Sequence, residues 1–383
     1  MKDLLRGEVT TLAHTVVVKV GTRVLTTADG TLNEQRIACL AEELCAIREA
    51  GRRVVLVSSG AVGAGMGQLG LKRRPTDLGK LQAVAAIGQT SLIETYDRVF
   101  RKFNRRAAQV LLTAEDVHDR DRCLNVRNTL WELLDFGVIP VINENDTVSV
   151  EELMPTFGDN DRLAALVTTL VRAPLLIILS DVEGLYTGDP ADANSTLIPL
   201  VHAVDESIRA LVRDKATGLS KGGMASKLEA ARIVTAAGEN AIVASGRDVR
   251  VLSRVMAGEA VGTLFLAQSK AVSSRKRWLA FSSRPRGKLI LDAGAARAIA
   301  RDGRSLLAIG IQSSEGDFQK GDIVAVCDPQ GQEIARGLTN YCRRDIEHIK
   351  GLKSNKIAQV LGGCPYEEVI HRDNLAVVGV ARV

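Results

Sequence analysis

Carboxylate and carboxamide side chains gather directly after an apolar run that is typical of a buried strand. The run Val138–Ile142 stops at Asn143, and two polar groups follow it: Asn143, Glu144, Asn145 and Asp146, then Asp159, Asn160 and Asp161. Open parallel sheets bind ligands where their strands end, at the carboxyl edge. Asn and Asp offer donors and acceptors at short reach. The two groups therefore predict a pocket for a small zwitterion such as an amino acid, the alternative being a polar turn with Asx caps.

Two lysines stand beside glycines in positions that suit a phosphate group. Lys19 lies near the end of the strand-like run Thr15–Val20, just before Gly21, and Lys227 follows the pair Gly222–Gly223 at the start of a predicted helix. Backbone N–H groups at a helix N-terminus and a lysine ammonium both attract anions. Two such lysines could flank a transferring phosphoryl group, a reaction that needs charge neutralisation and alignment more than covalent help.

Two further loops follow predicted strands. The glycine-rich segment Ser58–Gly65 resembles an anion-cradling loop, although it matches neither the Walker A pattern nor GxGxxG; the alternative is a tight turn with close helix packing. The segment Ser180–Pro190 mixes acidic, aromatic and glycine residues that could support a nucleotide base and ribose. The residues by themselves indicate a phosphate-handling α/β protein with an amino-acid-like pocket.

Short apolar strands alternate with helical patterns over the first 268 residues. The expected strands are 15–20, 53–57, 107–113, 138–142, 175–179 and 241–244. The expected helices are 33–50, 81–103, 124–136, 161–171 and 226–237. This alternation predicts βαβ units, that is, an open, mostly parallel sheet sandwiched by helices.

The pattern changes after residue 268. Residues 269–283 are polar and basic and are expected to form a linker, and residues 284–383 are expected to form a small β-rich domain with a C-terminal tail. The strands expected there are 287–291, 305–310, 322–327, 333–339 and 375–380.

Composition sets further bounds. The 383 residues are 46% hydrophobic and 25% charged, ordinary values for a globular protein. We expect neither a membrane span nor a signal peptide, and six scattered cysteines favour a reducing cytoplasm. Residues 270–383 hold 19 basic and 12 acidic side chains, against 31 and 33 in residues 1–269. A basic C-terminal part hints at a polyanionic partner, or simply at solubility and domain docking.

The segments above, in this order, resemble the amino acid kinase family over nearly the whole chain. The Asn143–Asp146 and Gly158–Asp161 pair is similar to that of the members that phosphorylate glutamate, and residues 284–365 resemble a PUA domain. The resemblance implies ATP-dependent phosphorylation of the L-glutamate side-chain carboxylate to L-glutamyl 5-phosphate, the first step of proline biosynthesis. It further implies Mg²⁺ as a cofactor, proline as an inhibitor, and a homo-oligomer, dimer or tetramer.

The resemblance also assigns roles to individual residues. Lys19 and Lys227 would stabilise the phosphoryl group, and Asp161 would orient both. Glutamate would be held by Ser59, Asp146 and Asn160, with Asn145 and Asp159 close by. ATP would contact Lys19, Gly21, Ser180, Asp181, Lys221, Gly222, Gly223, Met224, Ala225, Ser226 and Lys227. No residue is assigned as a metal ligand, because Mg²⁺ would bridge phosphate oxygens with water.

Two residues depart from the family pattern, and two other readings stay open. Lys221 replaces a hydroxyl residue, and Ser180 stands where threonine is common. The alternatives are another enzyme of the family, such as an acetylglutamate or aspartate kinase, and an RNA-binding protein that uses the basic PUA domain. Few aromatic residues lie in that domain, so it has few side chains on which RNA bases could stack.

Overall fold

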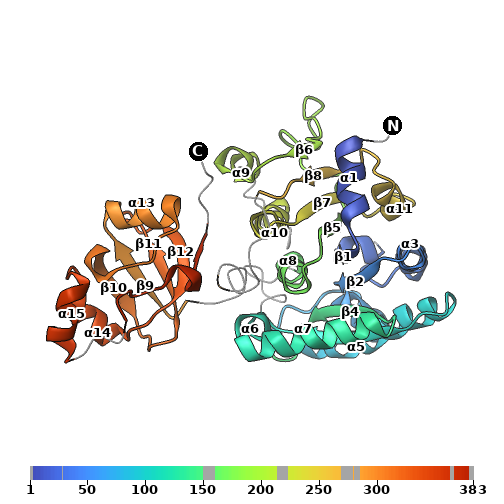
Figure 1. The fold of residues 1–383 in the computed structure, drawn as a ribbon. Coiled ribbons are helices and arrows are strands. Elements are labelled where there is room, and N and C mark those ends of the chain that lie inside the picture. The colour runs from blue at the N-terminus through green and yellow to red at the C-terminus, as the bar shows by residue number, and fades with distance from the viewer. Residues whose placement is uncertain are drawn as a thin grey trace. The chain divides into compact units, whose positions relative to one another are not determined.

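The chain divides into two compact units. The computed structural model describes residues 3–27, 29–149, 160–213, 223–268, 279, 285–362 and 366–378. The first unit comprises residues 1–117 and 121–270, and the second comprises residues 118–120 and 271–383. Figure 1 labels the helices and strands of both.

The first unit is built on a sheet that contains eight of the described strands. Their order is β3-β4-β2-β1-β5-β7-β8-β6. Neighbours are parallel except β7 and β8, which are antiparallel. The bounds are β1 (Thr15–Val20), β2 (Arg53–Ser58), β3 (Ala107–Leu112), β4 (Ile139–Glu144), β5 (Leu175–Ser180), β6 (Leu200–Val201), β7 (Asn240–Ser245) and β8 (Thr263–Phe265).

Helices cover both faces of this sheet. They are α1 (Leu4–Leu12), α2 (Thr22–Leu25), α3 (Glu34–Glu49), α4 (Ala61–Gln68), α5 (Leu78–Arg101), α6 (Ala114–His118), α7 (Arg120–Asp135), α8 (Asn160–Val171), α9 (Glu206–Arg213), α10 (Met224–Ala236) and α11 (Val251–Met256). In Figure 1, α8 and α10 lie on one side of the sheet, and α1, α3 and α11 lie on the other. The predicted mostly parallel α/β sheet is confirmed.

The central strand β1 shows how the sheet directs its side chains. All six of its residues are buried, as expected of a parallel strand covered on both faces. Val16, Val18 and Val20 share a core cluster with Leu40 and Leu44 of α3. Because side chains alternate along a strand, Lys19 points to the opposite face, where its ammonium reaches α8.

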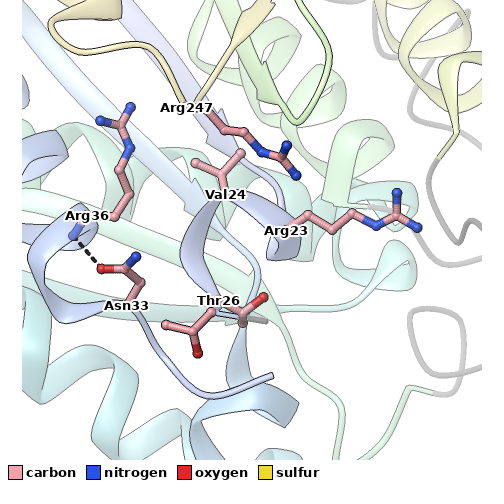
Figure 2. Close-up of a pocket in the computed structure, with 7 residues that line it drawn as sticks. Arg23, Val24, Thr26, Asn33, Arg36 and Arg247 are labelled. Carbon is pink, nitrogen blue, oxygen red and sulfur yellow. Dashed lines mark hydrogen bonds between the residues drawn. The ribbon is translucent and has the colours of Figure 1, made fainter. Parts of the chain in front are cut away.

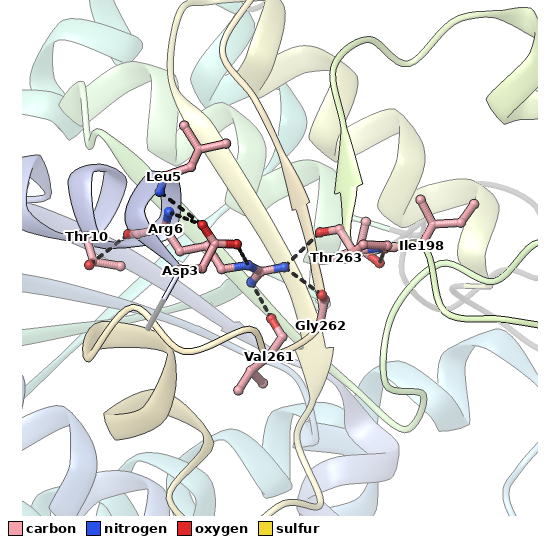
Figure 3. A network of polar contacts seen from close by, with 9 residues as sticks. Asp3, Leu5, Arg6, Thr10, Ile198, Val261, Gly262 and Thr263 are labelled. Carbon is pink, nitrogen blue, oxygen red and sulfur yellow. Dashed lines mark hydrogen bonds and ion pairs between the residues drawn. The ribbon is translucent and has the colours of Figure 1, made fainter. Parts of the chain in front are cut away.

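The first helix is fastened to the sheet by a buried arginine (Figure 3). Asp3 caps α1 by accepting hydrogen bonds from the Leu5 and Arg6 N–H groups. The Arg6 guanidinium donates to three backbone oxygens, at 2.5 Å to Val261, 2.7 Å to Pro199 and 2.8 Å to Gly262. Burial lowers the pKa of Arg6, and the nearby Asp3 carboxylate works in the opposite direction. Arg6 thus joins the N-terminal helix to the segment that leads into β8.

The glycine-rich segment after β2 serves packing as well as turning. Gly60 has φ of +109°, a conformation that favours glycine, and α4 begins at the next residue. A Cβ at Gly65 would collide with the Val84 carbonyl oxygen, and one at Gly88 would collide with the Ala61 carbonyl oxygen. The two helices α4 and α5 therefore approach backbone to backbone. The alternative interpretation of Ser58–Gly65, close helix packing, accounts for Gly65.

The second unit holds a separate five-stranded sheet of order β10-β9-β11-β12-β13 among its described residues. The strands are β9 (Gly287–Leu291), β10 (Ile311–Gly316), β11 (Ile323–Cys327), β12 (Glu333–Leu338) and β13 (Leu375–Val377). The helices are α13 (Ala293–Asp302), α14 (Arg343–Ile349) and α15 (Ser354–Leu361), with 3₁₀ turns η2 (Ala308–Gly310) and η3 (Arg372–Asn374). The β-rich second part is confirmed.

One predicted strand of the second unit is wrong. Residues 305–310 contain a single bridge at Leu306 and then the 3₁₀ turn η2, and the strand follows at Ile311–Gly316. A Cβ at Gly310 would collide with the Ala295 side chain. Leu306 and Ala308 are buried, whereas Leu307 and Ile309 are exposed. This alternation is also that of a strand, so the apolar run alone did not reveal the turn.

Candidate active site

A buried carboxylate holds two buried lysines at the carboxyl end of β1. The Lys19 Nζ atom lies 2.6 Å from Asp161 Oδ1, and the Lys227 Nζ atom lies 3.1 Å from Asp161 Oδ2. Asp161 is fully buried, and both lysines are at most 5% exposed. Three elements meet here, because Lys19 comes from β1, Asp161 from the first turn of α8 and Lys227 from the first turn of α10. The structure thus brings together the three predicted catalytic residues.

One carboxylate joins the two lysines of this cluster. Both ammonium groups contact Asp161, and Ser226 Oγ also donates to Asp161 Oδ2 at 2.9 Å. Buried charges are costly unless they are paired and hydrogen-bonded. Two ammonium groups held beside the same carboxylate are placed so that both could contact one anion.

The start of α10 adds backbone donors beside the cluster. Gly223 is the N-cap of α10 and makes no side-chain capping hydrogen bond to the first N–H groups of the helix. Met224 and Ser226 are half-buried and Ala225 is exposed. Of the predicted ATP segment, Lys221 and Gly222 lie outside the described residues.

The ends of β1, β5 and β7 form one continuous edge next to the lysines. The Gly21 N–H donates to the Leu179 carbonyl at 3.1 Å, and the Gly246 N–H donates to the Ser180 carbonyl at 2.7 Å. Ser180 Oγ donates to Asp181 Oδ1 at 3.2 Å. Burial alone would raise the pKa of Asp181, but hydrogen bonds from Arg23 and the backbone outweigh it and hold that pKa below its ordinary value. Asp181 is therefore an anion at neutral pH.

A second polar cluster lies where β2 and β4 end. The Asn160 side-chain amide donates to Ser59 Oγ at 2.8 Å and to Asn143 Oδ1 at 2.9 Å. All three residues are buried. Asn160 directly precedes Asp161. The start of α8 therefore carries both the amide that joins this polar cluster and the carboxylate that joins the lysine cluster. The structure brings Ser59 and Asn160 together, as predicted, and adds Asn143.

Asp146 completes this second cluster with a perturbed carboxyl group. Burial raises its pKa to about 6, opposed by a hydrogen bond from Gln89 and by the charge of Arg74. Gln89 Nε2 lies 3.4 Å from Asp146 Oδ2 and 3.4 Å from the Glu144 carbonyl oxygen. Asp146 Oδ1 and Asn143 Nδ2 are buried and have no hydrogen-bond partner among the described residues. One acceptor and one donor are therefore available to a small polar ligand.

For the other two predicted substrate residues, the structure shows no side-chain hydrogen bond to this cluster among the described residues. Asn145 is half-buried; its N–H donates to the Leu112 carbonyl, and its own carbonyl accepts from Val148 and Ser149, so its backbone shapes the turn after β4. Asp159 lies outside the described residues.

Gln89 is a site residue that the sequence analysis missed. It lies on the buried face of α5, whose other buried residues are mostly apolar. A glutamine among apolar residues at helical spacing, one position after a buried glycine, was the available signal, because buried polar side chains require a partner.

Two buried lysines beside a buried polar cluster, at the carboxyl edge of a parallel sheet, suit an enzyme of phosphoryl transfer. Comparison with known proteins agrees. The model of the amino acid kinase family matches residues 14–245, which run from the residue before β1 to the end of β7, and the PUA domain model matches residues 287–361. The chain belongs to the amino acid kinase family and is a kinase.

Individual relatives are similar over almost the whole chain. The glutamate 5-kinase of Rhodopirellula baltica is 51% identical over 360 residues, covering 94% of this chain and 92% of the relative. That of Moorella thermoacetica is 47% identical over 368 residues, covering 96% and 97%. The solved carbamate kinase of Giardia lamblia bound to AMP-PNP is 17% identical, with a TM-score of 0.48, and the match covers 67% of this chain and 99% of that one. The resemblance seen in the sequence is confirmed for both parts of the chain.

Proposed function

We propose that this protein phosphorylates the side-chain carboxylate of L-glutamate with ATP, giving L-glutamyl 5-phosphate in the first step of proline biosynthesis. The observation that carries the proposal is the adjacency of two clusters on one helix start, where Asn160 holds the polar pocket and Asp161 holds the two lysines. The names of the relatives, glutamate 5-kinases at 51% and 47% identity, support the substrate.

In this proposal the lysine cluster stabilises the phosphoryl group in flight. Lys19 and Lys227 approach its oxygens from two elements, and Asp161 holds both ammonium groups in position. Charge that is fixed before the reaction needs no reorganisation when the transition state forms. The acceptor carboxylate needs no general base, because it is already ionised at neutral pH.

The polar cluster is proposed to hold glutamate. The free acceptor on Asp146 suits the α-ammonium group, and Ser59, Asn160 and the free amide of Asn143 suit carboxylate oxygens. Asn145 and Asp159 are proposed to lie close to the same substrate. Its reactive carboxylate would then point toward the two lysines.

ATP is proposed to bind at the edge formed by Gly21, Ser180 and Asp181, together with the segment Lys221–Lys227. Its phosphates would meet the N–H groups at the start of α10. The described residues hold no group of three or more His, Cys, Asp and Glu side chains placed for a metal ion. Mg²⁺ in such sites keeps several waters and uses one or two carboxylates plus the substrate phosphates. The Asp181 carboxylate fits that modest requirement; bound Mg²⁺ would neutralise phosphate charge.

Several broader properties complete the proposal. Residues 1–268 are proposed as the kinase domain, 269–283 as the linker and 284–383 as the PUA-like domain with its tail. Inhibition by proline, a dimer or tetramer, a cytoplasmic location and RNA binding by the second domain stay predictions from the sequence. None of the helices among the described residues is long and apolar enough to cross a bilayer.

A coupled assay of ADP release tests the proposal directly. Purified full-length protein is offered L-glutamate, N-acetyl-L-glutamate and L-aspartate in turn, with ATP and Mg²⁺, and then L-glutamate with added proline. We expect turnover with glutamate, confirmed by trapping the acyl phosphate as a hydroxamate. A higher kcat/KM for N-acetylglutamate or aspartate would overturn the substrate assignment, and turnover that proline leaves unchanged would overturn the inhibition.

A further inference from the structure

A second pocket opens beside α2 (Figure 2). Its volume is about 520 Å³, and it is lined by Arg23, Val24, Thr26, Thr27, Asn33, Arg36 and Arg247. Arg23 and Val24 come from α2, Arg36 from the first turn of α3, and Arg247 from the turn that follows β7. The volume is sufficient for a small organic ligand.

This pocket lies toward the α3 face of the sheet. Val24 belongs to the core cluster that contains Leu40 and Leu44 of α3 and the alternate residues Val18 and Val20 of β1. Lys19 projects to the other face, where α8 supplies Asp161. Residues of the two proposed substrate sites are absent from the lining of the second pocket. It therefore has a composition of its own.

The lining contains three arginines and no acidic side chain. The Arg247 side chain makes no hydrogen bond or ion pair with the described residues, and Arg36 Nε is buried without a hydrogen-bond partner among them. Arg36 Nη2 donates to the Asp248 carbonyl oxygen at 3.0 Å, which fixes that side chain at the pocket.

The neighbouring carboxylates compensate this positive charge only in part. Asp181 forms an exposed ion pair with Arg23, at 2.9 Å, and the charge of Arg36 interacts with the buried carboxylate of Glu43. Asp248 lies 3.7 Å from Arg254, which also pairs with Glu259. Asp29 accepts hydrogen bonds from Thr27 and Thr31. Among the described residues, Arg247 is the lining arginine that has no carboxylate partner.

We propose that this pocket binds a phosphate group, either as the free anion or as a phosphate monoester carried by a small metabolite. The planar guanidinium fork matches phosphate oxygens in pairs, so an arginine that lines the pocket supplies both charge and geometry. The Asn33 amide and the threonine hydroxyls offer neutral polar groups around it. Arg23 connects this site to Asp181, at the proposed nucleotide edge.

Calorimetric titration of the full-length protein tests the proposal. Inorganic phosphate and ribose 5-phosphate are titrated separately at constant ionic strength, with and without Mg²⁺ and a non-hydrolysable ATP analogue that fills the nucleotide site. We expect saturable binding, one site per chain, that persists when the analogue is present. Tighter binding of ribose 5-phosphate would assign the site to a metabolite, and tighter binding of phosphate would assign it to the free anion.

Charge-removing variants locate the site. R247Q and R36Q should each weaken binding about tenfold or more, because a hydrogen bond to a charged group contributes roughly 1.5–3 kcal/mol. R304Q removes the same charge from an exposed position in the second unit and should leave binding unchanged. Arg247 is exposed, so R247Q carries the test even if R36Q folds poorly. Absence of saturable binding, or equal affinity in R247Q and the wild type, would overturn the proposal. Because no turnover is measured, a protein that fails to phosphorylate glutamate can still pass.

Discussion

The first unit buries positively charged side chains in two places, and their interaction partners differ. Arg6 is enclosed and donates to three backbone carbonyl oxygens, which are neutral, fixed and permanent. Lys19 and Lys227 are buried to a similar degree, but both contact the carboxylate of Asp161. A buried cation whose donors are satisfied by backbone serves the fold. Two buried cations gathered by one carboxylate are positioned to act together on a ligand.

The largest expected effect comes from removing either cation of the second place. K19A and K227A should each lower kcat by about 100-fold or more, as loss of a transition-state charge contact does. The KM for glutamate should change less, because the lysines act on the transferring group. Steady-state kinetics with both substrates measure this split, and a variant that raises KM alone would show that the lysine belongs to the substrate pocket.

At Arg6 we expect a substitution to change stability and to leave catalysis nearly unchanged. R6M should leave kcat within about twofold of the wild type but lower the free energy of unfolding by roughly 2–5 kcal/mol, because three buried carbonyls lose their donor. Chemical denaturation measures the difference. R98A, which breaks an exposed ion pair with Glu34, is the matched control and should cost less than about 1 kcal/mol. If R6M were as stable as R98A, the carbonyl contacts would have no structural role.

Intermediate effects are expected in the polar cluster. D146A and N160A should chiefly raise the KM for glutamate, by a factor equivalent to about 1–3 kcal/mol per lost partner. Their effect on kcat should be smaller than that of K227A. Unchanged KM in both variants would place the substrate elsewhere and would separate the two clusters in function.

The smallest effect is a pH dependence of stability that centres on Asp146. Its folded-state pKa of about 6 lies above the ordinary value, so the folded protein holds this proton more tightly than the unfolded chain does. Its contribution to stability is then fully present below about pH 4 and is lost as pH rises to about 6. The D146N side chain does not titrate, so this variant does not lose stability as the pH rises. Its free energy of unfolding relative to that of the wild type should therefore be higher at pH 7.5 than at pH 4.5, by roughly 1–3 kcal/mol.

Thermal unfolding of D146N and the wild type across this pH range provides the measurement. D205N is a suitable control, because Asp205 is exposed and its pKa is lowered by hydrogen bonds from Ser207 and the backbone of Ile208. A pH-independent difference between D146N and the wild type would mean that Asp146 is ionised in the folded protein at all these pH values.

Much of this architecture could be predicted from the sequence because parallel strands carry a strong signal. Each of the strands 15–20, 53–57 and 175–179 consists mostly of Val, Leu and Ile, and each is found within one residue of its expected bounds. Lys19 and Lys227 were singled out by their neighbouring glycines, the role of Asp161 was implied by the family resemblance, and the structure brings the three into contact. Their contact could not be derived from spacing, since Lys19 and Asp161 are separated by 142 positions in the sequence.

Other features were hidden because their causes are not local. Gln89 resembles any polar residue on a long helix until its neighbours Glu144 and Asp146 are placed beside it. Arg6 carries no signal at all, since its partners are backbone oxygens. In the segment 305–310, Leu306 and Ala308 are buried beside or within a 3₁₀ turn, and hydrophobicity alone does not distinguish such a turn from a strand.

The Arg6 contacts also have a consequence for the order in which the protein is made. The three acceptors of Arg6 lie 193, 255 and 256 residues further along the chain. At the usual rate of roughly 5–20 residues per second, the ribosome needs on the order of 10–50 s to deliver them. Throughout that time the N-terminal helix has no docking site for its guanidinium. The first helix to be synthesised is therefore among the last to be locked in place, and its attachment reports that the first unit is complete.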